Sequence, residues 1–237
     1  MRDKLMQKNH WDKMFRYYDD KIPWIDELVQ ETISEQGDDS IGANRAYSLQ
    51  FSSYMGYMNT LYSSGSSLEE IKTLYPKLVD IFKNVWDKSS EYVQMVWLLS
   101  IGIMLDVDES YIAELSELAK RDNLDDFLIN FLIHHNMPSW SFEGDEFQFD
   151  EPYSGLLRVI QSTNNNDASE LLRNYIERKW YSGHKEMGWY DMHKDKNILY
   201  HGYWSYESGV IAKILNLDDA GWDSMKYYPY DMVRYHS

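Results

Sequence analysis

The stretch Ser67 to Val85, SLEEIKTLYPKLVDIFKNV, predicts the class of fold because it carries both a helix start signal and a helical hydrophobic repeat. Ser67 and Glu70 have the spacing of a capping box, in which each side chain accepts from the other residue's backbone N–H. The apolar residues then recur every three or four positions, at Leu68, Ile71, Leu74, Leu78, Ile81 and Val85. This period is typical of an amphipathic α-helix. We expect Pro76 to kink or divide the helix, because proline removes a backbone donor.

The same period recurs on both sides of this stretch. Pro23 suits the first turn of a helix that runs toward Gly37. Further helices are predicted over 41–62, near 90–105, 109–121 and 124–135, from Asp167-x-x-Glu170 onward, and over 201–215. Hairpin signals are weak, since no Asn-Gly or Asp-Gly turn joins two β-rich runs. We therefore expect an all-α protein of about nine or ten helices in two closely packed helical units, residues 1–115 and 116–237.

The composition indicates a folded globular chain without disulfides. Its 237 residues are 43% hydrophobic and 16% aromatic, and none is cysteine, which excludes thiolate metal sites. The N-terminal residues lack the apolar run of a secretory signal. The longest apolar run, Met95 to Leu105, is far shorter than the roughly 20 residues of a membrane span. We expect a soluble protein that stays in the cytoplasm.

The charge balance is strongly acidic and unevenly distributed. The chain has 23 basic and 39 acidic residues, a net charge of −16, and residues 106–151 alone hold 13 acidic and 2 basic ones. Direct binding to nucleic acid is disfavoured, because phosphate contacts need Lys and Arg. A basic protein partner is favoured instead. Acidic bias also serves solubility alone, and that alternative stays open.

The segment Ser139 to Glu151, SWSFEGDEFQFDE, is the main predicted irregular loop, and we call it the acidic loop. It combines carboxylates with aromatic rings and contains no basic residue. Charge steers an encounter with a basic surface, and rings supply close contacts, so this composition suits recognition of a basic protein. The predicted contact residues are Glu143, Asp145, Glu146, Phe147, Asp150 and Glu151. An ordinary solvated loop is the alternative.

Glu207 is an ionisable residue on the apolar side of the helix predicted over 201–215. On a helical wheel it falls near the centre of the apolar side, among Tyr203, Trp204 and Ile211. Burial there would raise the pKa of the carboxyl group and suit it to acid–base work. The alternative, which we favour, is a structural glutamate that accepts hydrogen bonds from tyrosine, tryptophan or arginine donors.

Motifs for catalysis, cofactors or metals are missing from the sequence. It contains no Gly-x-Ser-x-Gly elbow, no cysteine nucleophile, no Gly-x-Gly-x-x-Gly and no P-loop. Its histidines match no paired helical metal motif. We therefore assign no catalytic residue, cofactor or metal. The rival enzyme hypothesis is an all-α metal-dependent hydrolase that uses Glu207 with His193 or His201, and a third hypothesis is an acidic scaffold for some other basic protein.

The C-terminal motifs resemble one known family. Gly202 to Leu215, GYWSYESGVIAKIL, is followed by Leu217-Asp-Asp219 and by Tyr227-Tyr-Pro-Tyr-Asp231. This order is similar to that of the PoNe immunity proteins (PoNi), which show Gly-Tyr-Trp-x-x-Glu, then Asp-Asp, then Tyr-Pro-Tyr-Asp. Arg178-Lys-Trp-Tyr181 and Trp189 fit the family's aromatic lead-in. The motif positions, which we take to be structural, are Tyr203, Trp204, Glu207, Asp218, Asp219, Tyr228, Pro229 and Asp231.

The resemblance implies a cytoplasmic, all-helical immunity protein that is not an enzyme. Its implied partner is a PoNe-type DNase toxin of the PD-(D/E)xK class, delivered by a type VI or type VII secretion system. Such a DNase presents a basic substrate groove, which an acidic inhibitor can occupy. The motifs themselves do not identify the residues that touch the toxin.

Overall fold

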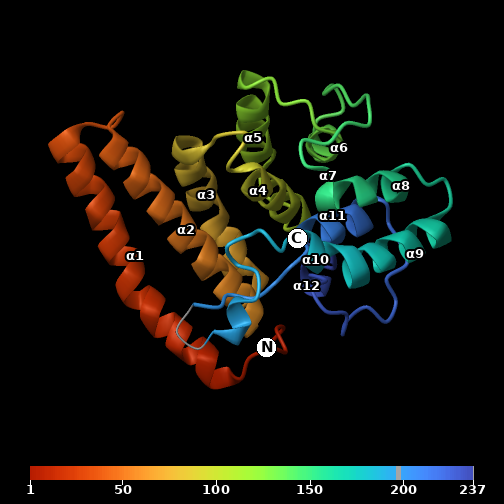
Figure 1. Ribbon diagram of the computed structural model, residues 1–237, viewed down its shortest axis with the longest axis horizontal. Helices are drawn as coiled ribbons and strands as arrows, with labels where there is room; N and C mark the ends of the chain where they lie inside the picture. The colour runs from red at the N-terminus through yellow and green to blue at the C-terminus, as the bar shows by residue number, and fades with distance from the viewer. Residues whose placement is uncertain (196–198, 237) are drawn as a thin grey trace. The chain divides into compact units, whose positions relative to one another are not determined.

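The computed structural model describes residues 1–195 and 199–236 (Figure 1). Every regular element in these residues is helical, which confirms the all-α prediction. Contacts group the chain into two units: unit 1 comprises Met1–Asp87 and Asp191–Tyr203, and unit 2 comprises Lys88–Tyr190 and Trp204–Ser237. The predicted division between residues 115 and 116 remains a prediction.

Unit 1 is built on three long helices. They are α1 (Lys8–Gln36), α2 (Ile41–Ser64) and α3 (Leu68–Val85), with the short 3₁₀ turn η3 (Met192–Lys194). Helix α2 packs against both α1 and α3 (Figure 1). Asp26 of α1 accepts hydrogen bonds from Gln50 Nε2 at 2.6 Å and from the Tyr54 hydroxyl at 2.8 Å. These two bonds set the register between α1 and α2.

The segment 199–203 returns from the far end of the chain to unit 1. The Tyr200 hydroxyl donates to Asp3 Oδ2 at 2.7 Å, and the Tyr200 carbonyl accepts from His10 Nε2 at 2.8 Å. The Ser63 hydroxyl donates to the His201 carbonyl at 2.6 Å. The N-terminus and the segment around residue 200 therefore share one core.

The prediction that a helix begins at Pro23 was wrong, and so was the division of a helix at Pro76, while the alternative of a kink at Pro76 stays a prediction. Pro23 lies inside α1, which begins at Lys8, and Pro76 lies inside an undivided α3. Each proline removes one backbone donor, yet burial of the apolar faces on both sides keeps the helix continuous. Tertiary packing therefore overrides the local stop signal at both positions.

Unit 2 surrounds a helix that is apolar on nearly all sides. This helix, α4 (Tyr92–Met104), packs mainly against α11 (Tyr206–Ile214) and α6 (Phe127–Asn136). The other helices are α5 (Glu109–Arg121), α7 (Asp150–Tyr153), η1 (Ser154–Leu156), α8 (Leu157–Ile160), α9 (Asn165–Tyr175), η2 (Ile176–Trp180), α10 (Tyr181–Gly183) and α12 (Tyr230–Val233). Across the part of the chain that the structure describes, no helix is long and apolar enough to span a membrane.

The helix predicted over 201–215 is shorter than expected. It begins at Tyr206, so Tyr203 and Trp204 precede the helix and the wheel argument does not apply to them. Gly202 adopts a left-handed backbone with φ of 104°, and the Ser205 N–H donates to the Tyr227 carbonyl at 2.8 Å. These features hold the chain in a non-helical path up to Ser205. Glu207 consequently lies in the first turn of α11.

Gly209 of α11 packs tightly against its neighbours. A Cβ atom added there would lie 2.4 Å from Pro229 Cγ and 2.8 Å from Met104 Sδ. The pyrrolidine ring cannot rotate away, so Gly209→Ala is expected to lower the free energy of unfolding by about 1–3 kcal/mol. Urea denaturation measures this loss. Gly188→Ala is the control, because a Cβ there meets no atom within 4 Å; equal effects of the two changes would contradict the prediction.

Candidate functional site

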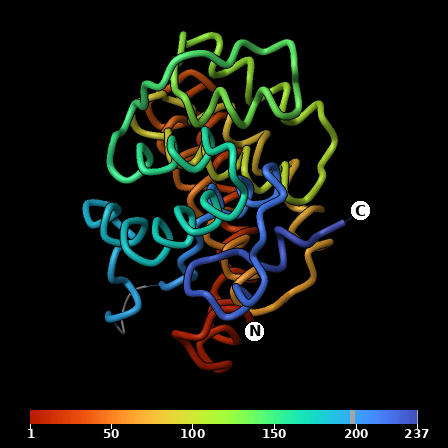
Figure 2. The backbone as a smooth tube through the Cα atoms, turned by 90° about the vertical axis from the view of Figure 1, so that its right-hand side faces the viewer, coloured from red at the N-terminus to blue at the C-terminus, as the bar shows by residue number. Residues whose placement is uncertain are grey.

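The acidic loop connects α6 to α7 and lies outside regular structure up to Phe149, much as predicted (Figure 2). The side chains of Glu143, Asp145, Glu146, Asp150 and Glu151 are all exposed. Within residues 1–195 and 199–236, no ion pair or side-chain hydrogen bond occupies these five carboxylates. They are therefore available to a partner.

Buried Asp126 anchors the C-terminal half of the acidic loop. Its Oδ2 accepts from the Gln148 backbone N–H at 2.9 Å and from the Tyr92 hydroxyl at 3.0 Å. Its Oδ1 caps α6 by accepting from the Ile129 N–H at 2.9 Å. Burial raises the pKa of Asp126, although the bonds from Ile129, Gln148 and Tyr92 oppose that rise. This carboxylate joins α4, α6 and the loop.

Phenylalanine rings anchor the loop along its length. Phe142 and Phe147 pack on Phe127, with ring centroids 5.1 Å and 5.4 Å away, and Phe149 packs on Tyr92 at 5.1 Å. Phe147, predicted to contact the partner, is half-buried in this cluster. Phe142 and Phe147 are half-buried and Phe149 is 41% exposed, while the carboxylates face solvent. The ring contacts hold the backbone that carries these charges.

The N-terminal half of the loop is fixed by Trp140. Its indole N–H donates to Asn130 Oδ1 at 2.9 Å, and its carbonyl accepts from His134 Nδ1 at 2.8 Å. His134 is therefore committed to the loop backbone through one ring nitrogen. Both ends of the acidic loop are tied to α6.

Glu207, the strongest sequence candidate for acid–base work, is fully enclosed, with 0% of its surface exposed. Its Oε1 accepts from the Ser205 hydroxyl at 2.9 Å and from the Tyr175 hydroxyl at 3.3 Å. Burial raises the pKa of Glu207 to about 7, and the bonds from Ser205 and Tyr175 and the nearby Trp180 indole oppose that rise. Among the described residues, Oε2 and Trp180 Nε1 have no partner with hydrogen-bond geometry.

Asp219 joins the remaining C-terminal motifs. It accepts from the Tyr228 hydroxyl at 2.8 Å and from both terminal nitrogens of Arg234, at 2.6 Å and 2.5 Å. Burial raises the pKa of Asp219, but the bonds from Arg234 and Tyr228 outweigh it, so the net shift is downward. This bidentate ion pair links Asp219, in the segment that follows α11, to Arg234, the residue that follows α12.

The other motif positions have local roles. Exposed Asp218 accepts from the Ala220 N–H at 3.0 Å. Pro229 is buried against Gly209, and exposed Asp231 lies in the first turn of α12. Tyr203 and Trp204 are both buried. These positions order the backbone around α11 and α12.

The metal-hydrolase hypothesis finds no donor set in the described part of the chain. His193 and His201 belong to unit 1 and Glu207 to unit 2. The His193 Nδ1 lies 2.9 Å from the Tyr203 hydroxyl, and the His201 Nδ1 lies 3.1 Å from the Tyr18 hydroxyl. No group of three or more His, Asp or Glu side chains among the described residues is arranged to hold a metal ion.

Two features of the structure were not predicted from the sequence. Asp126 carries a readable signal, because it directly precedes an apolar helix as an N-cap does, but the pattern does not reveal its bonds to the loop. An open pocket lined by Arg158, Arg173 and Arg178 also goes unpredicted, since these residues are scattered over 21 positions.

The described residues form an all-α protein with a set of exposed carboxylates on one anchored loop. Two family models match almost the whole chain: PoNe immunity protein (PoNi), N-terminal, over residues 2–117, and PoNe immunity proteins (PoNi), C-terminal, over residues 124–232. The chain belongs to the PoNe immunity protein family, which confirms the resemblance seen in its motifs. Membership of this family implies an immunity protein that acts against a PoNe nuclease toxin.

One solved structure supports the fold independently. The crystal structure of protein PA2201 from Pseudomonas aeruginosa matches with a TM-score of 0.70 and 15% identity, over 98% of this chain and 89% of that one. At this identity the likeness bears on the fold alone. The comparison with curated proteins found no match.

Proposed function

We propose that this protein neutralises a cognate DNase toxin of the PD-(D/E)xK class by placing its acidic loop against the toxin's basic DNA groove. The observation that carries the proposal is the set of five exposed carboxylates without internal partners on a loop held by Asp126 and Phe127. The protein acts as a non-enzymatic inhibitor in the cytoplasm. The toxin arrives through a type VI or type VII secretion system.

The anchoring of the loop supports this mode of inhibition. A DNase groove carries positive potential, so negative charges on the inhibitor accelerate the encounter and imitate the phosphates of DNA. A loop already held by hydrogen bonds and packed rings loses less conformational entropy on binding than a free loop. The backbone bond from Phe127 N–H to the Glu146 carbonyl, 2.8 Å long, holds the centre of the charged segment.

Neutralising the five carboxylates tests the proposal. Changing Glu143, Asp145, Glu146, Asp150 and Glu151 together to the matching amides is expected to lower the association rate with the purified toxin about tenfold at low salt. The salt dependence of that rate is also expected to flatten, because less long-range attraction remains to be screened. Stopped-flow or surface plasmon resonance measurements report both quantities.

The matched control removes five exposed carboxylates from α1. Asp12, Asp20, Glu27, Glu31 and Glu35 are changed to amides, so both variants lose the same net charge. The proposal expects the loop variant to lose far more than the α1 variant, in binding and in protection of cells that express the toxin. Equal losses would assign the effect to overall charge and would sink the loop as the interface.

A further inference from the structure

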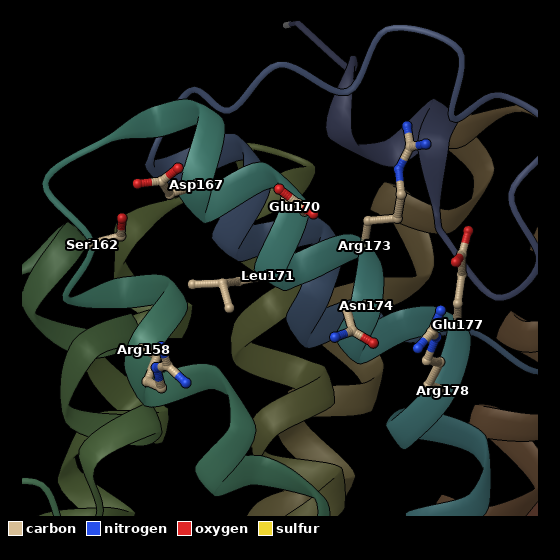
Figure 3. A pocket seen from close by; sticks show the side chains of 9 residues that line it. All are labelled: Arg158, Ser162, Asp167, Glu170, Leu171, Arg173, Asn174, Glu177 and Arg178. Carbon is tan, nitrogen blue, oxygen red and sulfur yellow. The ribbon is translucent and has the colours of Figure 1, made fainter.

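An open pocket of about 640 Å³ lies along α9 and η2, facing α8 (Figure 3). Arg158 of α8 lines one side, and Arg173 and Arg178 come from the continuous helical segment of α9 and η2. The pocket has an apolar and amide lining in Leu171 and Asn174. Three arginines in one pocket are notable in a chain with a net charge of −16.

Among the described residues, none of these arginines forms an ion pair, although acidic residues line the same pocket. Throughout the described ranges, Arg158 and Arg178 take part in no side-chain hydrogen bond or ion pair. Arg173 stacks over Trp222, with its guanidinium carbon 5.3 Å from the ring centroid. All three side chains are exposed. Their donors are therefore free to bind an external anion.

Acidic and basic side chains both line the pocket, with Glu170 and Glu177 on the same helical segment as Arg173 and Arg178. Asp167, Leu171, Asn174 and Arg178 follow one face of the helix, and eleven residues of helix put Asp167 roughly 16 Å from Arg178 along the axis. Figure 3 shows Asn174 between Arg158 and Arg178, Asp167 on the side of Arg158, and Glu177 beside Arg178. The Asp167 carboxylate lies in the first turn of α9, where the helix dipole favours a negative charge.

Lys179 follows Arg178 in the chain but is not part of the pocket lining. A Cβ atom added to Gly155 would lie 3.5 Å from Lys179 Cδ, so the Lys179 side chain passes close to the chain segment that leads to α8. Helix α9 continues here into the π-helical turn η2, which buries Trp180 while Arg178 and Lys179 stay exposed. Turns of this kind are frequent at functional sites.

We propose that this pocket binds an acidic side chain of the toxin, whose carboxylate is held by Arg158 and Arg178 and by the Asn174 amide. The inference rests on the proposed function and adds a second contact of opposite charge. A guanidinium fork matches a carboxylate in bidentate geometry. Glu170 and Glu177, also in the lining, repel a polyanion such as DNA but pair with basic residues beside the bound carboxylate.

The test compares two arginine pairs. Arg158→Gln with Arg178→Gln is expected to weaken toxin binding about tenfold, mainly through faster dissociation. The control, Arg16→Gln with Arg45→Gln, removes two exposed arginines from unit 1. Both variants become more acidic by the same two charges. If long-range attraction to a basic toxin were the only effect, their affinity for the toxin would be unchanged or higher. The two explanations therefore predict opposite directions for the pocket variant.

Each outcome is decisive. If the pocket variant binds the toxin as tightly as the control variant, the pocket is not a toxin contact, and binding by the wild type still upholds the proposed function. If the wild-type protein does not bind the toxin, both proposals are overturned. Arg158→Lys with Arg178→Lys keeps the charge but loses the fork, so partial rescue is expected. Inorganic phosphate is then titrated at constant ionic strength with the arginine N–H resonances as the readout. Saturation at micromolar phosphate would show that the ligand of the pocket is a free anion and would overturn the proposal of a toxin side chain.

Discussion

Asp126→Ala is expected to lower the free energy of unfolding by about 3 kcal/mol and to weaken toxin binding beyond that loss. The change leaves the Tyr92 hydroxyl and the N–H groups of Ile129 and Gln148 without their acceptor. A buried donor left without a partner costs about 1–3 kcal/mol, and water can reach Gln148 more readily than the other two. The acidic loop also loses its main backbone anchor, so ordering it on the toxin costs more.

Urea denaturation and calorimetric titration against the toxin measure the two effects. Asp125→Ala is the matched control, because this exposed neighbour accepts a single bond of 3.1 Å, from Asn130. Asp126→Asn keeps one acceptor oxygen and is expected to fall between the two. If Asp126→Ala lowered the free energy of unfolding by less than about 0.5 kcal/mol, it would behave like an ordinary surface substitution, and Asp126 would not be an anchor of the loop.

Local signals predicted the elements whose ends are determined locally. The capping box is present as expected: the Ser67 N–H donates to Glu70 Oε2 at 3.0 Å, and the Glu70 N–H donates to Ser67 Oγ at 3.2 Å. The helix predicted over 109–121 is α5, with the same bounds. In both cases the start signal and the hydrophobic period lie within a few residues of each other.

Elements whose ends depend on distant residues were predicted poorly. The start of α11 is set by the bond from Ser205 to Tyr227, and the passage of α1 and α3 through proline is sustained by packing. The exposure of the loop carboxylates could be predicted from composition. The role of Asp126 could not, because its partners Tyr92 and Gln148 are 34 and 22 positions away.

Glu207→Gln is expected to stabilise the protein above neutral pH by roughly 3 kcal/mol, each unit of pKa shift being worth about 1.4 kcal/mol. Burial raises the pKa of Glu207 from 4.5 to about 7. Below pH 4.5 the group is protonated in both states and contributes no penalty. Between pH 4.5 and 7 the folded protein holds a proton that the unfolded chain has lost, so the free energy of unfolding falls as the pH rises. Glutamine resembles the protonated acid and removes this loss.

The wild-type pH profile alone hides the effect of Glu207. Burial lowers the pKa of neighbouring His184 to about 4, while its bond to the Trp180 carbonyl opposes that shift. The unfolded chain therefore binds the extra proton at His184 between pH 4 and 6.5, and stability rises with pH there. The two slopes oppose each other, so the informative quantity is the difference between Glu207→Gln and wild type at each pH.

Urea denaturation from pH 5 to 8 measures that difference. It is expected to grow with pH and to level off above pH 7, whereas Glu186→Gln, the same change at an exposed position, stays within about 0.5 kcal/mol at every pH. Glu207→Ala leaves the Tyr175 hydroxyl without its acceptor, whereas the Ser205 hydroxyl keeps Ser208 at 2.6 Å, and at pH 5 it is expected to cost roughly 1–3 kcal/mol. A constant difference between Glu207→Gln and wild type would mean that the carboxylate titrates normally, and a loss of toxin binding without loss of stability would make Glu207 part of the interface.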